Sequence, residues 1–399
     1  MLEYKDFLID VGDFAINIGP QHPSTHGVLR IFVKLDGETV ISAEPIIGYL
    51  HTGMEKFAEF RTYHQAETIT DRMDYVSGAG NNLGYILTVE KLCGVKPPKK
   101  AEYVRVILAE LTRISSHLVW LGTHAVDIGA LTEFLYCFRE RELILDIIET
   151  MTGSRMTPSF FRVGGIAMDI HHYFIDKIRD FIKIFPEKIN EYEALLTKNK
   201  IWFERTKNIG IISAEDAVSF AFTGPNLRGS GLKYDVRKNN PYSSYEDFDF
   251  DIPVGDIGDV YDRYLVRIEE MRQSLKIVSQ AVENIPEGEY LSYDEYPQYV
   301  IPPKKRALTT MEGMISLFKY GMDGIKPPKG EAYVSIENPR GELGYYIVSD
   351  GSAFPYRMRV RPPSFCSISA ICKMCKGYLL ADLVSIIGSI DFLLGESDR

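Results

Sequence analysis

The sequence has no uninterrupted apolar stretch of the roughly 20 residues that a membrane-spanning helix needs. The nearest approach, residues 378–394, is interrupted by Asp382 and Asp391. The first six residues are mostly charged or polar and do not resemble a secretory signal. We therefore expect a cytoplasmic chain without a membrane span of its own, which docks on membrane proteins.

The chain also lacks a basic surplus and a cysteine framework. Its formal net charge of -10 argues against a general nucleic-acid surface. Five cysteines in 399 residues imply no disulfide scaffold. Cys372 and Cys375 form a single CxxC pair with Cys366 nearby, but no histidine cluster adjoins them to complete a zinc site. We interpret them as ordinary, partly buried thiols.

Nucleotide-binding and hydrolase motifs are missing as well. There is no Walker loop, GxSxG elbow or kinase motif. The nearest candidate, Gly78, Gly80 and Gly84, has the spacing GxGxxxG and does not lie between a strand and a helix. We interpret these glycines as small residues that let helices pack closely.

Hydrophobic periodicity predicts an α+β fold. Residues 13–47 alternate in the manner of strands, and Asp36-Gly37 predicts a hairpin turn between two of them. From about residue 53 to 153 the period becomes helical. Further helices are predicted at 131–151, within 175–197, and at 259–285 and 311–320; further strands are predicted at 332–336, 343–348 and 356–360. The result is a central helical bundle with small N-terminal and C-terminal antiparallel sheets, which we divide into a β region (1–50) and an α+β domain (51–399).

Several shorter segments have their own signatures. Residues 213–216 resemble a capping box that opens a short helix. Residues 223–254 are rich in glycine, proline and tyrosine, which favours a packed covering loop. Residues 286–308 form a connection. The charged residues 139–142 are expected to be the solvated face of a helix.

Histidine, tyrosine and aspartate supply the candidate site. His22 and His26 lie in a loop stiffened by Pro20 and Pro23. Their spacing could hold a metal on a helix, but the glutamate of HExxH is missing and Pro23 opposes a helix interior, so the residues alone favour a structural role.

Two further candidates follow in the chain. Arg72 and Tyr75 are three residues apart on a predicted helix and could face one pocket, although an exposed charge cluster is the simpler local interpretation. Asp127 comes just after His124 at the predicted end of a helix, where it could cap that helix or pair with a cation.

Eight strings taken together resemble one family, the quinone-site subunit of respiratory complex I, which is related to the NiFe-hydrogenase large subunit. The strings are GPQHPSTHGVLR (19–30), TDRMDY (70–75), LAELTRISSHL (108–118), RVGG (162–165), TGPNLRGSG (223–231), DRYLVRIEEMRQS (262–274), ENPRGELGYY (337–346) and RVRPPSF (359–365). They occur in this order and cover essentially the whole chain.

The resemblance implies a peripheral subunit on the cytoplasmic side of the cell (inner) membrane, in a proton-pumping NADH:quinone oxidoreductase. It implies docking on a small subunit that holds the terminal 4Fe–4S cluster, on a sibling peripheral-arm subunit, and on a membrane subunit at the quinone entrance. Quinone is then the substrate, NADH and FMN bind elsewhere in the complex, and this chain holds no redox cofactor of its own.

The hydrogenase relative holds its metals with two CxxC motifs, one near each end of the chain. Here the corresponding strings, residues 51–56 (HTGMEK) and 395–399 (GESDR), contain no cysteine. Because nothing remains there to hold nickel and iron, we expect no metal centre and interpret the former metal pocket as a ligand pocket.

By position, the resemblance implies that His26 and Tyr75 bind and protonate the quinone headgroup and that Asp127 pairs with His26. A phenol and an imidazolium can both donate hydrogen bonds to quinone oxygens. A carboxylate behind the imidazole favours its charged form. The remaining expected site residues are His22, Arg72, Asp391 and Leu393.

Two departures from the family concern the cluster. Relatives commonly have HRGxEK where this chain has Thr52, and Met-His-Pro where it has Thr157. Two fewer potential positive charges make cluster reduction harder, so we expect a low-potential quinone such as menaquinone and a low, weakly pH-dependent cluster potential.

Three alternatives stay open at this stage. The same chain would serve a complex driven by ferredoxin or a reduced deazaflavin, because the electron donor binds elsewhere. A non-catalytic scaffold for the cluster subunit would share the fold without binding quinone. A hydrogenase role is disfavoured by the missing thiolates.

Overall fold

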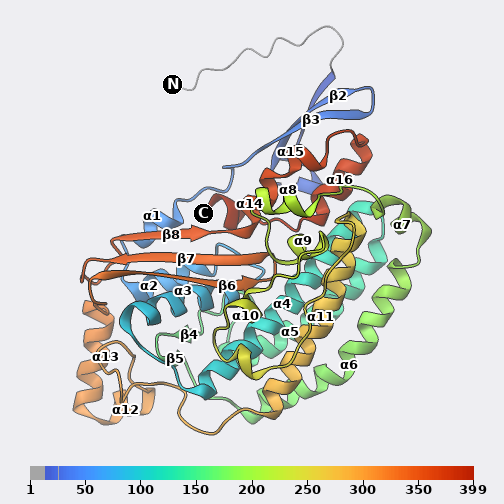
Figure 1. The fold of residues 1–399 in the computed structure, drawn as a ribbon. Coiled ribbons are helices and arrows are strands. Elements are labelled where there is room, and N and C mark those ends of the chain that lie inside the picture. The colour runs from blue at the N-terminus through green and yellow to red at the C-terminus, as the bar shows by residue number, and fades with distance from the viewer. Residues whose placement is uncertain (1–13, 26) are drawn as a thin grey trace, which may run out of the picture.

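Four long helices form the centre of the computed structural model, which describes residues 14–25 and 27–399. They are α4 (Lys99–Ile128), α5 (Leu131–Thr152), α6 (His172–Leu196) and α11 (Val260–Glu283). Helix α4 packs against both α5 and α11, and α6 packs against α5 and α11 in turn (Figure 1). Gly129 caps the C-terminal end of α4, and its φ of 106° is a left-handed conformation that suits glycine.

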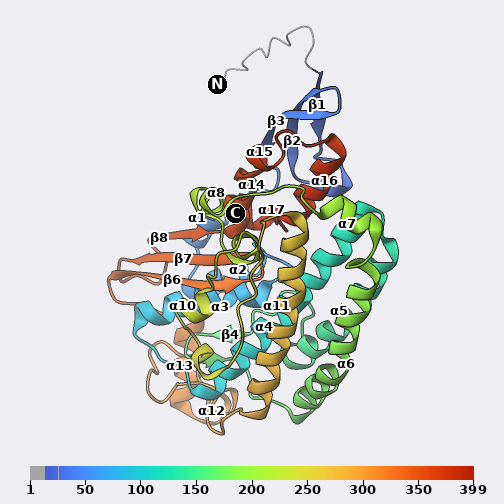
Figure 2. The ribbon, with the colours of Figure 1, turned by 45° about the vertical axis from the view of Figure 1, so that its right-hand side comes forward.

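The N-terminal sheet is an antiparallel ribbon of β1 (Phe14–Ile18), β2 (Arg30–Asp36) and β3 (Thr39–Ile46). The predicted hairpin is present, since Asp36 pairs with Thr39 across Gly37 and Glu38. Its buried face shares a hydrophobic core with α15 (Ile371–Met374) and α16 (Leu380–Ser389), and Figure 2 shows these segments side by side.

The C-terminal sheet is also antiparallel, in the order β6 (Gly330–Asn338), β7 (Gly341–Ser349) and β8 (Arg357–Arg361). It packs on α3 (Gly78–Cys93), which begins with the small-residue run. A Cβ on Gly80 would lie 2.2 Å from the Asn338 side chain, and one on Gly84 would lie 3.0 Å from the Tyr345 ring. These glycines do allow close packing of α3, as predicted, but its partner at Gly80 and Gly84 is the C-terminal sheet and not another helix.

Short elements connect these parts. The helices are α1 (Met54–Ala58), α2 (Tyr63–Thr70), α7 (Lys200–Thr206), α8 (Ala214–Ser219), α9 (Gly224–Gly229), α10 (Val236–Asn239), α12 (Lys304–Thr309), α13 (Met311–Asp323), α14 (Pro363–Ser369) and α17 (Leu394–Asp398). Two 3-10 turns, Pro23–Thr25 and Tyr245–Asp247, and a small hairpin of β4 (Phe161–Arg162) and β5 (Gly165–Ile166) lie between them. No helix within residues 14–25 and 27–399 is long and apolar enough to cross a membrane.

Three local predictions were wrong. Arg72 and Tyr75 do not lie on a helix, because α2 ends at Thr70 and a series of turns follows. The charged run of α5 is not wholly solvated: Glu140 is 2% exposed and accepts a hydrogen bond from the Tyr192 hydroxyl at 2.5 Å. Residues 223–254 are not a plain loop but contain α9, α10 and a 3-10 turn.

The N-cap of the predicted capping box at α8 is present, and the Asp216 carboxylate accepts the Ser213 hydroxyl at 2.8 Å. The Ser213 hydroxyl accepts the backbone N–H of Asp216 at 3.2 Å, as the sequence pattern indicated. The division at residue 50 stays a prediction.

A buried ion cluster joins the bundle to the C-terminal sheet. Its members, each at most 2% exposed, are Glu110, Arg113, His117, Arg228, Asp235, Arg237, Glu270 and Glu337. Glu270 on α11 is central, since Arg228 lies 3.1 Å away and His117 3.2 Å away. Burial would raise the pKa of Glu270, but Arg228 and the hydrogen bond with His117 hold it well below its ordinary range.

We predict that Glu270→Gln lowers the free energy of unfolding by about 3–5 kcal/mol, because it leaves buried guanidinium groups without their anion. Urea unfolding followed by tryptophan fluorescence would measure this. The control is Glu269→Gln on the same helix, whose side chain is 41% exposed and should matter by less than about 1 kcal/mol. Equal effects of the two variants would contradict a special role for the cluster.

Candidate functional site

The loop segment 19–25 is held together by its own polar groups. The Thr25 hydroxyl lies 3.2 Å from the Pro20 carbonyl and 3.0 Å from the His22 carbonyl, either of which can accept its hydrogen. The backbone N–H of Ser24 donates to Nδ1 of His22 at 3.3 Å. His26 lies outside the described residues, so its predicted role stays a prediction.

Asp127 connects the same loop to the end of α4. The Ser24 hydroxyl donates to Oδ1 of Asp127 at 3.2 Å. The 3-10 turn Pro23–Thr25 also contacts α16, so the loop, α4 and the C-terminal helices meet at one place. Asp127 therefore lies beside the loop where the sequence analysis expected it to pair with a histidine.

Tyr75 lies on a turn that the neighbouring Asp74 fixes. Oδ1 of Asp74 accepts the backbone N–H groups of Val76 at 3.2 Å and Ser77 at 2.9 Å. Its Oδ2 accepts Nδ2 of Asn338 at 3.1 Å and Nη1 of Arg340 at 2.7 Å. With four hydrogen bonds and no exposure, the Asp74 carboxylate holds this turn against the β6–β7 connection.

Arg340 extends this arrangement to the C-terminal segment. Its Nη2 lies 3.3 Å from Oδ1 of Asp391, which follows α16. Asp391 has a φ of +50°, a left-handed conformation that is uncommon outside glycine and recurs at functional sites. We call Asp74, Arg340 and Asp391 the Arg340 triad. It joins three segments that are far apart in the sequence.

The Tyr75 side chain remains accessible although its turn is fixed. The residue is 41% exposed, while Asp74 is fully buried. Partial burial raises the pKa of the Tyr75 phenol; the nearby Arg340 guanidinium lowers it and the Asp74 carboxylate raises it. Tyr75 is therefore a neutral hydrogen-bond donor at physiological pH.

The other expected residues lie in different settings. Leu393 is 5% exposed, and its backbone N–H lies 3.3 Å from the Ser364 hydroxyl. Arg72 is exposed and donates to the Thr68 carbonyl. The adjacent Asp71 accepts the Ser159 backbone N–H at 2.9 Å, which fixes the segment containing Thr157 beside the Tyr75 turn.

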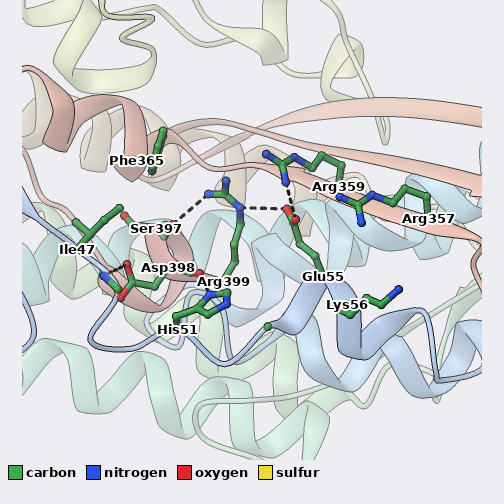
Figure 3. A pocket seen from close by; sticks show the side chains of 12 residues that line it. Ile47, His51, Glu55, Lys56, Arg357, Arg359, Phe365, Ser397, Asp398 and Arg399 are labelled. Carbon is green, nitrogen blue, oxygen red and sulfur yellow. Dashed lines mark hydrogen bonds and ion pairs between the residues drawn. The ribbon is translucent and has the colours of Figure 1, made fainter. Parts of the chain in front are cut away.

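The strings at 51–56 and 395–399 meet at a separate pocket of about 420 Å³. Figure 3 shows the Arg399 side chain reaching Glu55, whose carboxylate also binds Arg359; the Arg399–Glu55 distance is 3.1 Å. Asp398 accepts the backbone N–H groups of Gly48 at 2.9 Å and Leu50 at 2.8 Å. We call this the terminal pocket.

The terminal pocket is rich in cations. Lys56, Arg357, Arg359 and Arg399 line it, against the two carboxylates of Glu55 and Asp398. No group of three or more histidine, cysteine or acidic side chains placed to hold a metal occurs within residues 14–25 and 27–399. Cys372 is exposed and Cys375 is buried, so the CxxC pair does not present two thiols to one pocket.

Sequence reasoning missed the residues that position the others. Asp74, Asn338 and Arg340 occur in the strings TDRMDY and ENPRGELGYY, but no local pattern shows that these strings touch. The one sequence feature that pointed to this contact is Gly80, a small residue at which α3 packs closely against Asn338, next to the β6–β7 connection.

Similarity to known proteins shows the family of this chain. Residues 127–399 match the family model for the respiratory-chain NADH dehydrogenase 49 Kd subunit. The chain is 56% identical over 385 residues to an NADH-quinone oxidoreductase subunit of Geotalea uraniireducens, a match that covers 96% of this chain and 98% of that one. The corresponding subunit of Geobacter metallireducens is 53% identical over the same length and coverage.

The chain therefore belongs to the 49 Kd subunit family of complex I. It is a subunit of a quinone-reducing NADH dehydrogenase, an oxidoreductase complex.

We predict that Arg340→Met reduces quinone reduction by the assembled complex at least about tenfold, a change equivalent to about 1.4 kcal/mol. The variant leaves the buried Asp74 and Asp391 without their shared cation and so loosens the Tyr75 turn. Arg340→Lys, which keeps the charge, should recover part of the rate. Arg179→Met, which removes an exposed guanidinium on α6, is the control and should leave the rate unchanged.

Proposed function

We propose that this chain binds the quinone headgroup between Tyr75 and His26, and that electrons reach the quinone from a 4Fe–4S cluster in a neighbouring subunit. The observation that best supports this is the Arg340 triad, which fixes the turn carrying Tyr75 while the residue as a whole stays 41% exposed. A rigid backbone with an accessible hydrogen-bond donor suits recognition of a small carbonyl ligand.

The proposed chemistry needs two donors. Reduction of a quinone to a quinol adds two electrons and two protons. Tyr75 donates a hydrogen bond to one carbonyl oxygen and gives up its proton as negative charge develops there. His26, backed by Asp127, serves the other oxygen. The hydrogen bond from Ser24 to Asp127 supports this pairing, because it holds the loop that contains His22 and Ser24 against the Asp127 carboxylate.

The remaining expected residues would line the same site. In this proposal Asp391 and Leu393 would approach it from the C-terminal segment, His22 from the loop and Arg72 from the Tyr75 turn. This chain then supplies binding and protons but no redox cofactor; NADH and FMN belong to other subunits of the complex.

The sequence analysis interpreted the strings of the terminal pocket as a ligand pocket; because the headgroup site is assigned to the Tyr75 turn, we propose instead that this pocket is the docking face for the cluster-bearing subunit. It includes the string 51–56, which the family resemblance places near the cluster, and its cationic lining would attract an acidic partner surface. A sibling peripheral-arm subunit and a membrane subunit at the quinone entrance complete the set of partners. The complex would sit at the cytoplasmic side of the membrane and couple quinone reduction to proton pumping.

Two variants test the headgroup site. Tyr75→Phe and His26→Ala should each lower quinone reduction by about 10²-fold, since each removes a general acid. Oxidation of NADH with an artificial acceptor should be unchanged, because that activity does not use this site. Wild-type quinone reduction in both variants, together with no quinone photolabelling near Tyr75, would favour the scaffold alternative. A ferredoxin- or deazaflavin-driven complex would instead show as a different set of input subunits.

A redox titration tests the expected cluster properties. Because Thr52 and Thr157 stand where relatives commonly carry arginine and histidine, we predict a low cluster potential that shifts by well under the roughly 59 mV per pH unit expected for one proton per electron. Thr157→His should raise both the potential and its pH dependence. A high, strongly pH-dependent potential in the unmodified complex would reject this proposal and the expected use of a low-potential quinone.

A further inference from the structure

A third carboxyl group adjoins the Arg340 triad. Glu396 on α17 is 1% exposed. Its carboxyl group interacts electrostatically with the Arg340 guanidinium, as the carboxyl groups of Asp74 and Asp391 do. One buried guanidinium thus faces three carboxyl groups. An uncompensated buried carboxylate is so unfavourable that such a group takes up a proton instead. The carboxyl group with the fewest compensating contacts is therefore the one expected to hold a proton.

The hydrogen bonds identify which one. Asp74 accepts four hydrogen bonds, one of them from Arg340 at 2.7 Å, and Asp391 lies 3.3 Å from the same guanidinium. The Oε2 of Glu396 accepts the Ser364 hydroxyl at 2.5 Å, whereas its Oε1 is buried without a hydrogen-bond partner among residues 14–25 and 27–399. Glu396, which forms no ion pair within these residues, is the carboxyl that holds the proton.

Electrostatics agrees with this assignment. Burial raises the pKa of Glu396 to about 8, the Asp74 charge adds to the rise, and Arg340 and the Ser364 hydrogen bond oppose it. Tyr345 on β7 also faces Glu396; its phenol donates to Asn81, and burial raises its pKa far above the ordinary value. Glu396 is therefore neutral at physiological pH and loses its proton in the mildly alkaline range.

A neutral buried acid on the segment that packs against the Tyr75 turn can resupply the proton that Tyr75 gives up. A phenol that has protonated a reduced quinone becomes a phenolate, and the next turnover requires its proton back. We propose that Glu396 is the internal proton store of the headgroup site and reprotonates Tyr75. This inference rests on the proposed function and adds to it the source of the proton that Tyr75 recovers.

The step balances without any further reactant. The two electrons come from the neighbouring cluster, and Tyr75 gives its proton to the quinone oxygen. The O–H bond of Glu396 then breaks as the O–H bond of Tyr75 forms again, which leaves a Glu396 carboxylate that solvent reprotonates. The segment carrying Glu396 packs on the start of the Tyr75 turn, since a Cβ on the preceding Gly395 would lie 2.7 Å from the Met73 carbonyl oxygen.

The test is Glu396→Gln in the assembled complex. The amide is isosteric and keeps an acceptor for Ser364 but cannot supply a proton. Steady-state quinone reduction should fall about 10²-fold, the lower end of what general acid–base catalysis contributes. In the unmodified complex the rate should fall as pH rises through about 8, because the protonated glutamate is the active form. In the variant this pH-dependent fall should be absent.

The matched control is Glu133→Gln on α5. Burial raises the pKa of Glu133 to about 8 as well, but this glutamate contacts Cys137 and lies outside the site. Glu133→Gln should show the same rate of quinone reduction as the unmodified complex and the same decline in rate at high pH. Glu396→Asp should recover part of the lost rate.

Two outcomes overturn the proposal. One is an unchanged rate and pH profile in Glu396→Gln while Tyr75→Phe is impaired; if Tyr75→Phe is also unimpaired, the headgroup assignment itself has failed. If the Glu396→Gln complex does not assemble, the Ser364→Ala variant tests the proposal instead. It removes a hydrogen bond that lowers the glutamate pKa, so the alkaline decline should move to higher pH. An unmoved decline is the second overturning outcome.

Discussion

The ion pair between Arg340 and Asp74 is the interaction on which the site depends. At 2.7 Å and almost out of contact with water, it fixes the turn before Tyr75 to the β6–β7 connection. The second arm of the same guanidinium reaches Asp391. Since a buried guanidinium is stable only with anions around it, the three segments are mutually dependent. A tyrosine on an otherwise irregular segment thereby gains a fixed position.

Charge also organises the core behind this site. The β6–β7 connection that carries Arg340 directly follows the end of β6, where Glu337 is a member of the buried ion cluster. The same short stretch thus pairs with Arg228 on one side and with Asp74 on the other. Many buried charges in one continuous region constrain the relative positions of α4, α11 and the C-terminal sheet more strictly than apolar contacts would, because ion pairs require defined distances and directions.

Local patterns were enough to predict the regular elements. Alternation in β1–β3, the Asp36-Gly37 turn, the helical period of α4 and the cap at Ser213 each depend on neighbours a few residues apart, and each is present. The turn around Tyr75 could not be predicted in this way. Its conformation is set by Asn338 and Arg340, more than 260 residues away, so the local i, i+3 spacing suggested a helix that does not form.

The site residues likewise differ in whether the sequence could reveal them. Tyr75, Asp127 and Asp391 were identified through family resemblance, and the structure gives two of them defined polar partners, Ser24 for Asp127 and Arg340 for Asp391. Arg340 and Glu396 were overlooked because an arginine in a turn and a glutamate near the end of the chain look like ordinary surface residues in sequence. Only their burial, at 3% and 1% exposure, distinguishes them.

The wide separation of the triad in the sequence has a consequence for biosynthesis. A ribosome makes Asp74 first, Arg340 much later and Asp391 last of the three. During that interval the β6–β7 connection can dock on the Tyr75 turn, but the guanidinium has only one of its two anions. The site can close only after the segment following α16 has emerged, so a nascent chain arrested before that point would hold Tyr75 in an incomplete setting.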